Sequence, residues 1–316
     1  MLKLKSLKIL LLVIAAGLVL IIGFFNKDRA TDLSTIKRDY SGSLEFGDLM
    51  RTYHVHLPPS YDGKKSAPFL LVFHGAGGNS KDMKFFDAIA DREGFIVVYP
   101  DGYKRTWADG SGVTAAELAG VDDLGFVSAL IDKLADELKI DPSRIYATGF
   151  SNGGMLVQRF GCELSDKIAA IASVGGTMVE KISSRCNPMR PVPVMIIHGT
   201  EDSIVPWEGG EVKIVGISGW RILSVSGTFK KWIDINGCSF PRVSNDLSGA
   251  DEGTLLLQNV YDKCKNNTEV VLYALKGGGH TWPTRIQLLE SLSDKTRLYI
   301  NAGEVIWTFF EKHPKK

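Results

Sequence analysis

The sequence reads IYATGFSNGG from Ile145 to Gly154. A β-prone apolar run leads into a G-x-S-x-G turn, and residues with a helical period follow from Met155 to Phe160. So tight a turn leaves no room for side chains on both flanks of Ser151, which explains the flanking glycines. The strain of the turn projects the serine hydroxyl outward. This strand, turn and helix context predicts that Ser151 is a catalytic nucleophile and not a structural turn serine.

Continuous apolar runs on both sides of this turn are typical of buried parallel strands. They cover residues 69–73, 95–99, 145–147, 168–174 and 192–197. Helix-period segments alternate with them, among them 83–92, 123–138 and 155–160, and Asp122 or Asp123 can cap the longest one. We therefore expect an α/β fold, with a doubly wound, mostly parallel sheet and helices on both faces. In such a sheet the active site collects at the carboxyl ends of the strands.

An alternating segment precedes these runs, from Arg51 to Leu57, and predicts a half-buried antiparallel strand. His54 and His56 share one face of it. Two such histidines could bind a metal ion, but the sequence offers no further ligand nearby. We therefore expect a solvated strand face and no metal site.

A serine nucleophile needs a histidine base and an acid that orients the base. Asp202 follows a buried run in the sequence HGTED, in which Glu201 is the competing acid. His280 lies on a glycine-rich loop after the apolar run 270–275. The order serine, acid, histidine is that of α/β-hydrolases, so we expect Asp202 and His280 to complete the triad. His198 is expected to shape the acid loop.

The transition state of ester cleavage carries negative charge, which calls for preformed hydrogen-bond donors. The backbone N–H of Asn152 directly follows the nucleophile. The loop FHGAGG, from Phe73 to Gly78, follows an early strand and predicts a second donor at Ala76. No G-K-[ST] follows this loop, so it is not a phosphate cradle, and no cofactor is expected.

The N-terminus has a different composition. Lys3, Lys5 and Lys8 precede an unbroken apolar run at 9–25, which predicts a signal peptide or an N-terminal membrane anchor. No small-x-small cleavage site follows, which favours an uncleaved anchor. Either form places the rest of the chain outside the cytoplasm, extracellular or periplasmic. Residues 26–42 are polar and predict a linker, and residues 43–316 are the expected catalytic domain.

Export makes disulfides expected for the four cysteines, Cys162, Cys186, Cys238 and Cys264. Three connectivities are open, and the two sequence-local pairs close the shortest loops. The 37 basic and 36 acidic residues leave no net field to attract nucleic acid, so no such partner is expected.

Seven motifs together resemble the secreted polyhydroxybutyrate depolymerase and feruloyl esterase group of carbohydrate esterase family one, over most of the chain after the linker. They are R-T-Y at 51–53, HGAGG at 74–78, YPDG at 99–102, VDDLGF at 121–126, GFSNGG at 149–154, HGTED at 198–202 and GGGHTWP at 277–283. The H-G-x-x-D pattern of that group favours Asp202 over Glu201. Two disulfides that pair these four cysteines would also be similar to the disulfides of that group.

This resemblance implies a cofactor-free serine esterase with the α/β-hydrolase fold and without a large lid. Its substrates would be feruloyl or acetyl esters of polysaccharide, or short hydroxyalkanoate polyesters. Four aromatic residues, Tyr103, Trp107, Trp207 and Trp282, follow strands and are expected to line the mouth of the site. A serine peptidase of the same fold and a non-catalytic binding protein on a hydrolase scaffold are the alternatives.

Overall fold

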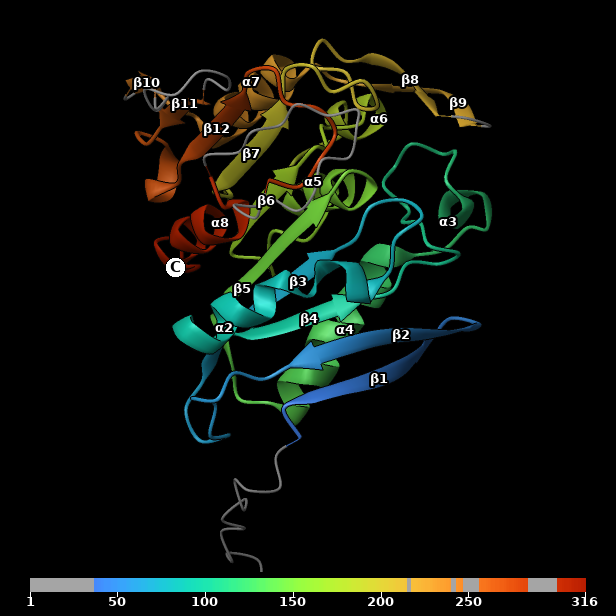
Figure 1. Ribbon diagram of the computed structural model, residues 1–316, viewed down its shortest axis with the longest axis vertical. Helices are drawn as coiled ribbons and strands as arrows, with labels where there is room; N and C mark the ends of the chain where they lie inside the picture. The colour runs from blue at the N-terminus through green and yellow to red at the C-terminus, as the bar shows by residue number, and fades with distance from the viewer. Residues whose placement is uncertain (1–36, 215–216, 240–242, 247–255, 284–299) are drawn as a thin grey trace, which may run out of the picture. The chain divides into compact units, whose positions relative to one another are not determined.

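The computed structural model in Figure 1 describes residues 37–214, 217–239, 243–246, 256–283 and 300–316. Residues 38–316 form one compact unit. The expected signal peptide or anchor, and the linker as far as residue 36, lie outside the described residues. Strand β1 begins at Asp39, so the last four residues of the expected linker, 39–42, belong to the fold. Among the helices that the structure describes, none is long and apolar enough to cross a membrane.

The main sheet has the strand order β1-β2-β4-β3-β5-β6-β7-β12-β11-β10 within the described residues. Its parallel centre consists of β4 (Ile96–Pro100), β3 (Ala67–Phe73), β5 (Ile140–Phe150), β6 (Ala170–Val174), β7 (Val194–Gly199) and β12 (Val270–Leu275). Antiparallel strands β1 (Asp39–Phe46), β2 (Leu49–His56), β11 (Leu256–Tyr261) and β10 (Val243–Asp246) extend its two edges. The expected doubly wound, mostly parallel sheet is confirmed.

Helices cover both faces of this sheet (Figure 1). The longer ones are α2 (Asp87–Glu93), α4 (Asp123–Glu137), α5 (Asn152–Glu163), α7 (Val225–Asn236) and α8 (Ala302–Glu311). The other helical elements among the described residues are η2 (Ser80–Phe86), α3 (Ala115–Leu118), α6 (Glu180–Ser183) and η3 (Lys265–Asn267). A separate hairpin, β8 (Gly210–Ile214) and β9 (Ile217–Ile222), follows the acid loop. Asp122 caps α4 by accepting from the N–H of Gly125, as one of the two expected caps.

The central strands are apolar on both faces because helices pack against both. In β3, Leu70 and Val72 belong to the cluster that also contains Phe86 of η2 and Phe310 of α8. Phe73 points to the other face, where its ring centroid lies 5.1 Å from that of Phe160 in α5. Every residue of β3 is buried, which explains why its sequence is an unbroken apolar run and does not alternate.

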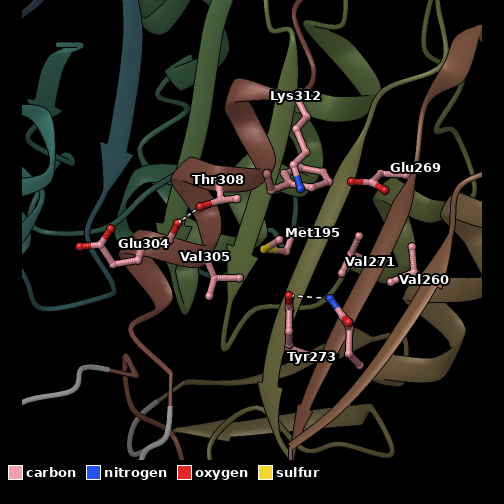
Figure 2. Close-up of a pocket in the computed structure, with 11 residues that line it drawn as sticks. Met195, Val260, Glu269, Val271, Tyr273, Glu304, Val305, Thr308 and Lys312 are labelled. Atoms are coloured by element: carbon pink, nitrogen blue, oxygen red, sulfur yellow. Dashed lines mark hydrogen bonds between the residues drawn. The ribbon is translucent and has the colours of Figure 1, made fainter. Parts of the chain in front are cut away.

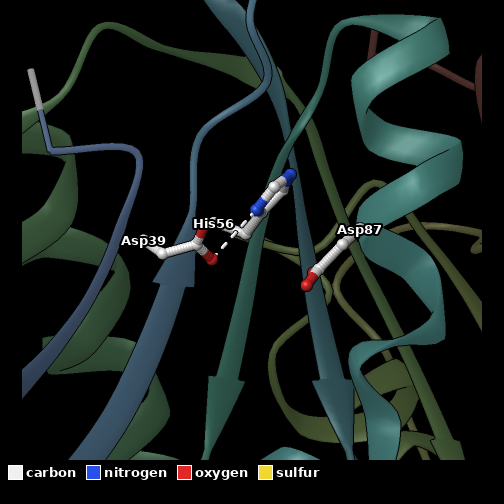
Figure 3. Close-up of side chains that lie close together, drawn as sticks. All are labelled: Asp39, His56 and Asp87. Carbon is white, nitrogen blue, oxygen red and sulfur yellow. Dashed lines mark hydrogen bonds and ion pairs between the residues drawn. The ribbon is translucent and has the colours of Figure 1, made fainter.

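His56 at the end of β2 is not on a solvated strand face, so that expectation is wrong for this residue. Its Nδ1 lies 3.1 Å from Asp39 (Figure 3), and its Nε2 lies 2.8 Å from Asp91. Burial alone would lower the pKa of His56, but the hydrogen bonds to these two carboxylates outweigh it and raise the pKa. His56 thus joins β1 to α2, and the Lys84 ammonium, 3.7 Å from Asp39, supplies a further positive charge.

Two disulfides close the sequence-local pairs, Cys162 with Cys186 and Cys238 with Cys264. The first attaches the end of α5 to the segment after α6. The second attaches the end of α7 to the turn before η3. No cysteine is free. Of the three connectivities left open by the sequence, the structure has the one with the shortest loops.

Candidate active site

Ser151 lies in the turn between β5 and α5 with φ 54° and ψ −118°, a conformation that residues other than glycine rarely adopt. Its flanking glycines are required by close packing. A Cβ atom on Gly149 would overlap the carbonyl of Gly153, and one on Gly153 would lie 2.5 Å from the carbonyl oxygen of Phe73. The turn therefore has the geometry of a nucleophile elbow, at the carboxyl end of the central strand β5.

The structure brings the three expected triad residues together. His280 Nε2 lies 2.9 Å from Ser151 Oγ, and His280 Nδ1 lies 2.7 Å from Asp202 Oδ2. The partners assign the protons, because a carboxylate only accepts: Nδ1–H donates to Asp202, and Nε2 accepts from the serine hydroxyl. Glu201, the competing acid, has an exposed side chain that takes no part in this chain of hydrogen bonds.

The acid loop fixes the second carboxylate oxygen of Asp202. Oδ1 accepts from the backbone N–H groups of Ile204, at 2.9 Å, and Val205, at 2.8 Å. Burial would raise the pKa of Asp202, but the hydrogen bond and charge of His280 and the Val205 N–H outweigh it and hold the pKa below its usual value. The group is therefore a carboxylate at neutral pH.

His198 closes the same loop. Its Nε2–H donates to the carbonyl of Val205 at 2.8 Å, and its ring is buried beside Asp202. Burial lowers the pKa of His198, so its imidazole is neutral. The expected role of His198 in shaping the acid loop has this geometric basis.

The two expected oxyanion donors lie on segments that flank Ser151. Asn152 begins α5, and Ala76 lies in the exposed loop after β3. Among the described residues, neither backbone N–H donates an internal hydrogen bond, so both are free to bind a ligand oxygen. The N-terminus of α5 adds its partial positive charge at the same place.

The aromatic residues expected at the mouth of the site differ in their exposure. Trp107 has no exposed surface, so its expected contact with substrate is wrong. Tyr103, Trp207 and Trp282 are partly exposed. The Trp282 ring packs against Phe85, with ring centroids 5.0 Å apart.

Two features of the site were not anticipated from the sequence. The Phe150 ring lies between two other rings of the site. Its centroid is 4.8 Å from that of His280 and 6.4 Å from that of Trp282. Trp107 is buried between the two segments that carry the expected oxyanion donors, and it donates hydrogen bonds to Asn152 and to the carbonyl of His74. The position of Phe150 inside the G-x-S-x-G turn was a signal for the first, whereas the second depends on tertiary packing alone.

A cavity of about 500 Å³ lies away from the triad, between α8 and the strands β7, β12 and β11 (Figure 2). Met195, Val271, Val305 and Phe309 give it apolar walls, and on the wall formed by β11 and β12 Tyr273 accepts a hydrogen bond from Gln258. It shares no residue with the triad.

Sequence comparison finds esterases among the similar proteins. Residues 116–218 match the family model described as phospholipase/carboxylesterase. Feruloyl esterase B of Piromyces equi is 31% identical over 235 residues, which are 72% of this chain and 42% of that protein. Feruloyl esterase C of Emericella nidulans is 24% identical over 73% of this chain and 76% of its own. This chain therefore spans less than half the length of the Piromyces relative.

Among solved structures, the acetyl xylan esterase from Aspergillus awamori superimposes with a TM-score of 0.57. The match covers 86% of this chain and 99% of that one at 13% sequence identity, which establishes a shared fold. The resemblance to feruloyl esterases, expected from the motifs, is confirmed by the relatives.

Proposed function

We propose that this chain, which has the α/β-hydrolase fold, is a serine esterase in which Ser151, His280 and Asp202 act as nucleophile, base and orienting acid. One observation carries the proposal: His280 lies within hydrogen-bond distance of both partners, 2.9 Å from Ser151 Oγ and 2.7 Å from Asp202 Oδ2. A similar chain of groups activates the serine in unrelated hydrolases.

The reaction proceeds through an acyl-enzyme. Ser151 Oγ attacks the ester carbonyl carbon while His280 Nε2 takes its proton, and the tetrahedral oxyanion accepts from the N–H groups of Asn152 and Ala76. His280 then protonates the leaving alcohol. A water molecule, deprotonated by the same nitrogen, releases the acid and restores the serine. Asp202 holds the Nδ1–H tautomer throughout and stabilises the imidazolium that forms.

The proposed substrates are feruloyl, acetyl or short hydroxyalkanoate esters, the last of the polyhydroxybutyrate type. The names of the relatives support the first two classes, since the similar proteins include feruloyl esterases and an acetyl xylan esterase. Trp282 and Trp207 are partly exposed on the histidine and acid loops, where an aromatic face suits a flat acyl group or a sugar ring. We therefore include both in the proposed substrate site.

The proposed location is extracellular or periplasmic, with the chain secreted or anchored through residues 9–25. Two disulfides support an oxidising compartment.

A panel of p-nitrophenyl and methyl esters tests the substrate proposal. We expect kcat/KM for methyl ferulate and for acetyl or hydroxybutyryl esters to exceed that for acyl chains beyond about eight carbons, and peptide amides not to be cleaved. Trp282→Ala should raise KM for the feruloyl ester more than for acetate, whereas Trp282→Phe should retain most of the binding. Faster cleavage of peptide amides than of esters would assign a peptidase instead.

A further inference from the structure

The oxyanion donors proposed above lie 76 positions apart in the sequence, on the loop after β3 and at the start of α5. Their backbone N–H groups must converge on one oxygen atom, so something must fix the distance between the two segments. Direct packing contributes part of this, because Gly153 approaches the carbonyls of Phe73 and His74 too closely for a Cβ atom. A third segment, residues 107–109, contacts both.

Trp107 is hydrogen bonded to both segments. Its backbone N–H donates to Asn152 Oδ1 at 2.8 Å, and its indole Nε1–H donates to the carbonyl of His74 at 2.9 Å. The ring is fully buried and packs edge-on against Phe73, with centroids 5.2 Å apart. Trp107 thus joins the two segments, through its backbone N–H to the Asn152 side chain and through its indole to the carbonyl of His74, two residues before Ala76.

Asp109 completes the hydrogen bonding of the Asn152 side chain. Asn152 Nδ2 donates to Asp109 Oδ2 at 2.7 Å and to the carbonyl of Trp107 at 3.2 Å. Asp109 Oδ1 accepts from the N–H of Ser111 at 2.9 Å. Burial raises the pKa of Asp109 to about 6, so the group is mostly ionised at neutral pH and accepts from both donors. The carboxamide of Asn152 therefore has a partner for its oxygen and for both of its N–H bonds.

Hydrogen bonds from neighbouring elements fix the position of the 107–109 segment. Ala108 N–H donates to Asp123 Oδ2 at 2.7 Å, and Asp123 is paired with Arg51 at 2.6 Å in a buried ion pair. Arg159 donates to the carbonyl of Ala108 at 2.8 Å. Because these contacts come from β2, α4 and α5, the segment has a fixed position relative to the sheet.

From this geometry we propose that Trp107 and Asp109 are positioning residues for the oxyanion hole. By binding the Asn152 side chain and the His74 carbonyl, they hold the backbone N–H of Asn152 and the loop of Ala76 at the separation that the transition state requires. They touch no substrate. This inference rests on the proposed esterase function. It adds two residues outside the triad that position the oxyanion donors.

Kinetics of two variants test it. Trp107→Phe keeps an aromatic ring, although a smaller one, and leaves the His74 carbonyl without its donor. Asp109→Ala leaves Asn152 Nδ2 with a single acceptor. Loss of an entire oxyanion donor lowers kcat by about 10²–10³-fold, so displaced donors should lower it by about 10- to 100-fold while KM changes less than about twofold. Asp109→Asn, whose side-chain oxygen can still accept from Asn152, should recover part of kcat.

The control is Trp307→Phe, a substitution of another buried tryptophan, which lies in α8 and packs against the rings of Phe95 and Tyr146. It should leave kcat and KM unchanged. A parallel fall of kcat in this control, or a rise of KM equal to the fall of kcat in the two test variants, would overturn the positioning role.

Covalent labelling separates this inference from the function on which it rests. An alkyl fluorophosphonate phosphonylates a reactive serine with loss of fluoride, and its phosphoryl oxygen must enter the oxyanion hole. Mass spectrometry should show Ser151 labelled in the wild type, and labelled at least about tenfold more slowly in Trp107→Phe and Asp109→Ala. A wild type that neither reacts nor hydrolyses any ester contradicts the proposed function. A reactive wild type with equally reactive variants contradicts the positioning role alone.

Discussion

At the scale of single residues, the acid of the triad is the sharpest assignment. Asp202 and Glu201 are neighbours in sequence, yet only Asp202 is buried against His280, with Oδ1 occupied by two backbone N–H groups. We expect Asp202→Asn to lower kcat on the order of 10⁴-fold, because the amide would favour the wrong tautomer of His280. Glu201→Gln is the matched control and should change kcat less than about threefold. Steady-state kinetics with p-nitrophenyl acetate gives both values, and the opposite ranking would move the acid to Glu201.

The triad could be predicted from the sequence because each of its residues has a local signal. Ser151 lies in a glycine-flanked turn, and Asp202 and His280 follow apolar runs in the expected order. Trp107 has no such signal. A tryptophan on a loop after a strand can face solvent or lie under the loop, and only the neighbouring segments decide between these positions. The same is true of His56, whose carboxylate partners come from β1 and α2.

At the scale of elements, His56 joins the first strand to α2 through Asp39 and Asp91. Because the pKa of His56 is raised in the folded chain, this contribution to stability is complete below the unfolded value of about 6.5 and is lost as pH rises through the higher folded value. His56→Gln should therefore destabilise the fold at pH 6 and much less at pH 9.

Urea unfolding at the two pH values measures this difference. A destabilisation by His56→Gln that is equal at pH 6 and pH 9 would show that the ionised His56 contributes nothing.

The central strands were predictable because burial on both faces makes them continuous apolar runs. The ends were not: β5 begins at Ile140, although its apolar run begins at Ile145, because the polar residues 141–144 precede the buried part. The outer strands β10 and β11 and the hairpin β8–β9 have short or mixed hydrophobic patterns in their sequences, because an edge strand packs against fewer neighbours. Such patterns do not identify a strand. The first four residues of β1, 39–42, fall within the predicted linker for the same reason: the residues of this strand alternate between exposed and half-buried positions.

At the scale of the whole molecule, the two disulfides close loops with sequence separations of 24 and 26 residues. Loops of this length reduce the entropy of the unfolded chain by an amount worth about 3 kcal/mol each. We expect Cys162→Ser with Cys186→Ser, and separately Cys238→Ser with Cys264→Ser, to lower the free energy of unfolding by about 2–4 kcal/mol.

Denaturant unfolding of the two double variants checks this. The loops are nearly equal in length, so the two losses should be similar wherever chain entropy dominates. An unchanged free energy of unfolding in both variants would contradict a stabilising role for the disulfides.

The central claim is that the chain hydrolyses esters through Ser151. Its most direct test compares the wild type with Ser151→Ala on p-nitrophenyl acetate and methyl ferulate, with circular dichroism to verify that both are folded. We expect an active wild type and a folded variant whose kcat is lower by about 10⁴-fold or more. A folded Ser151→Ala protein that still cleaves these esters at the wild-type rate would show that Ser151 is not the nucleophile.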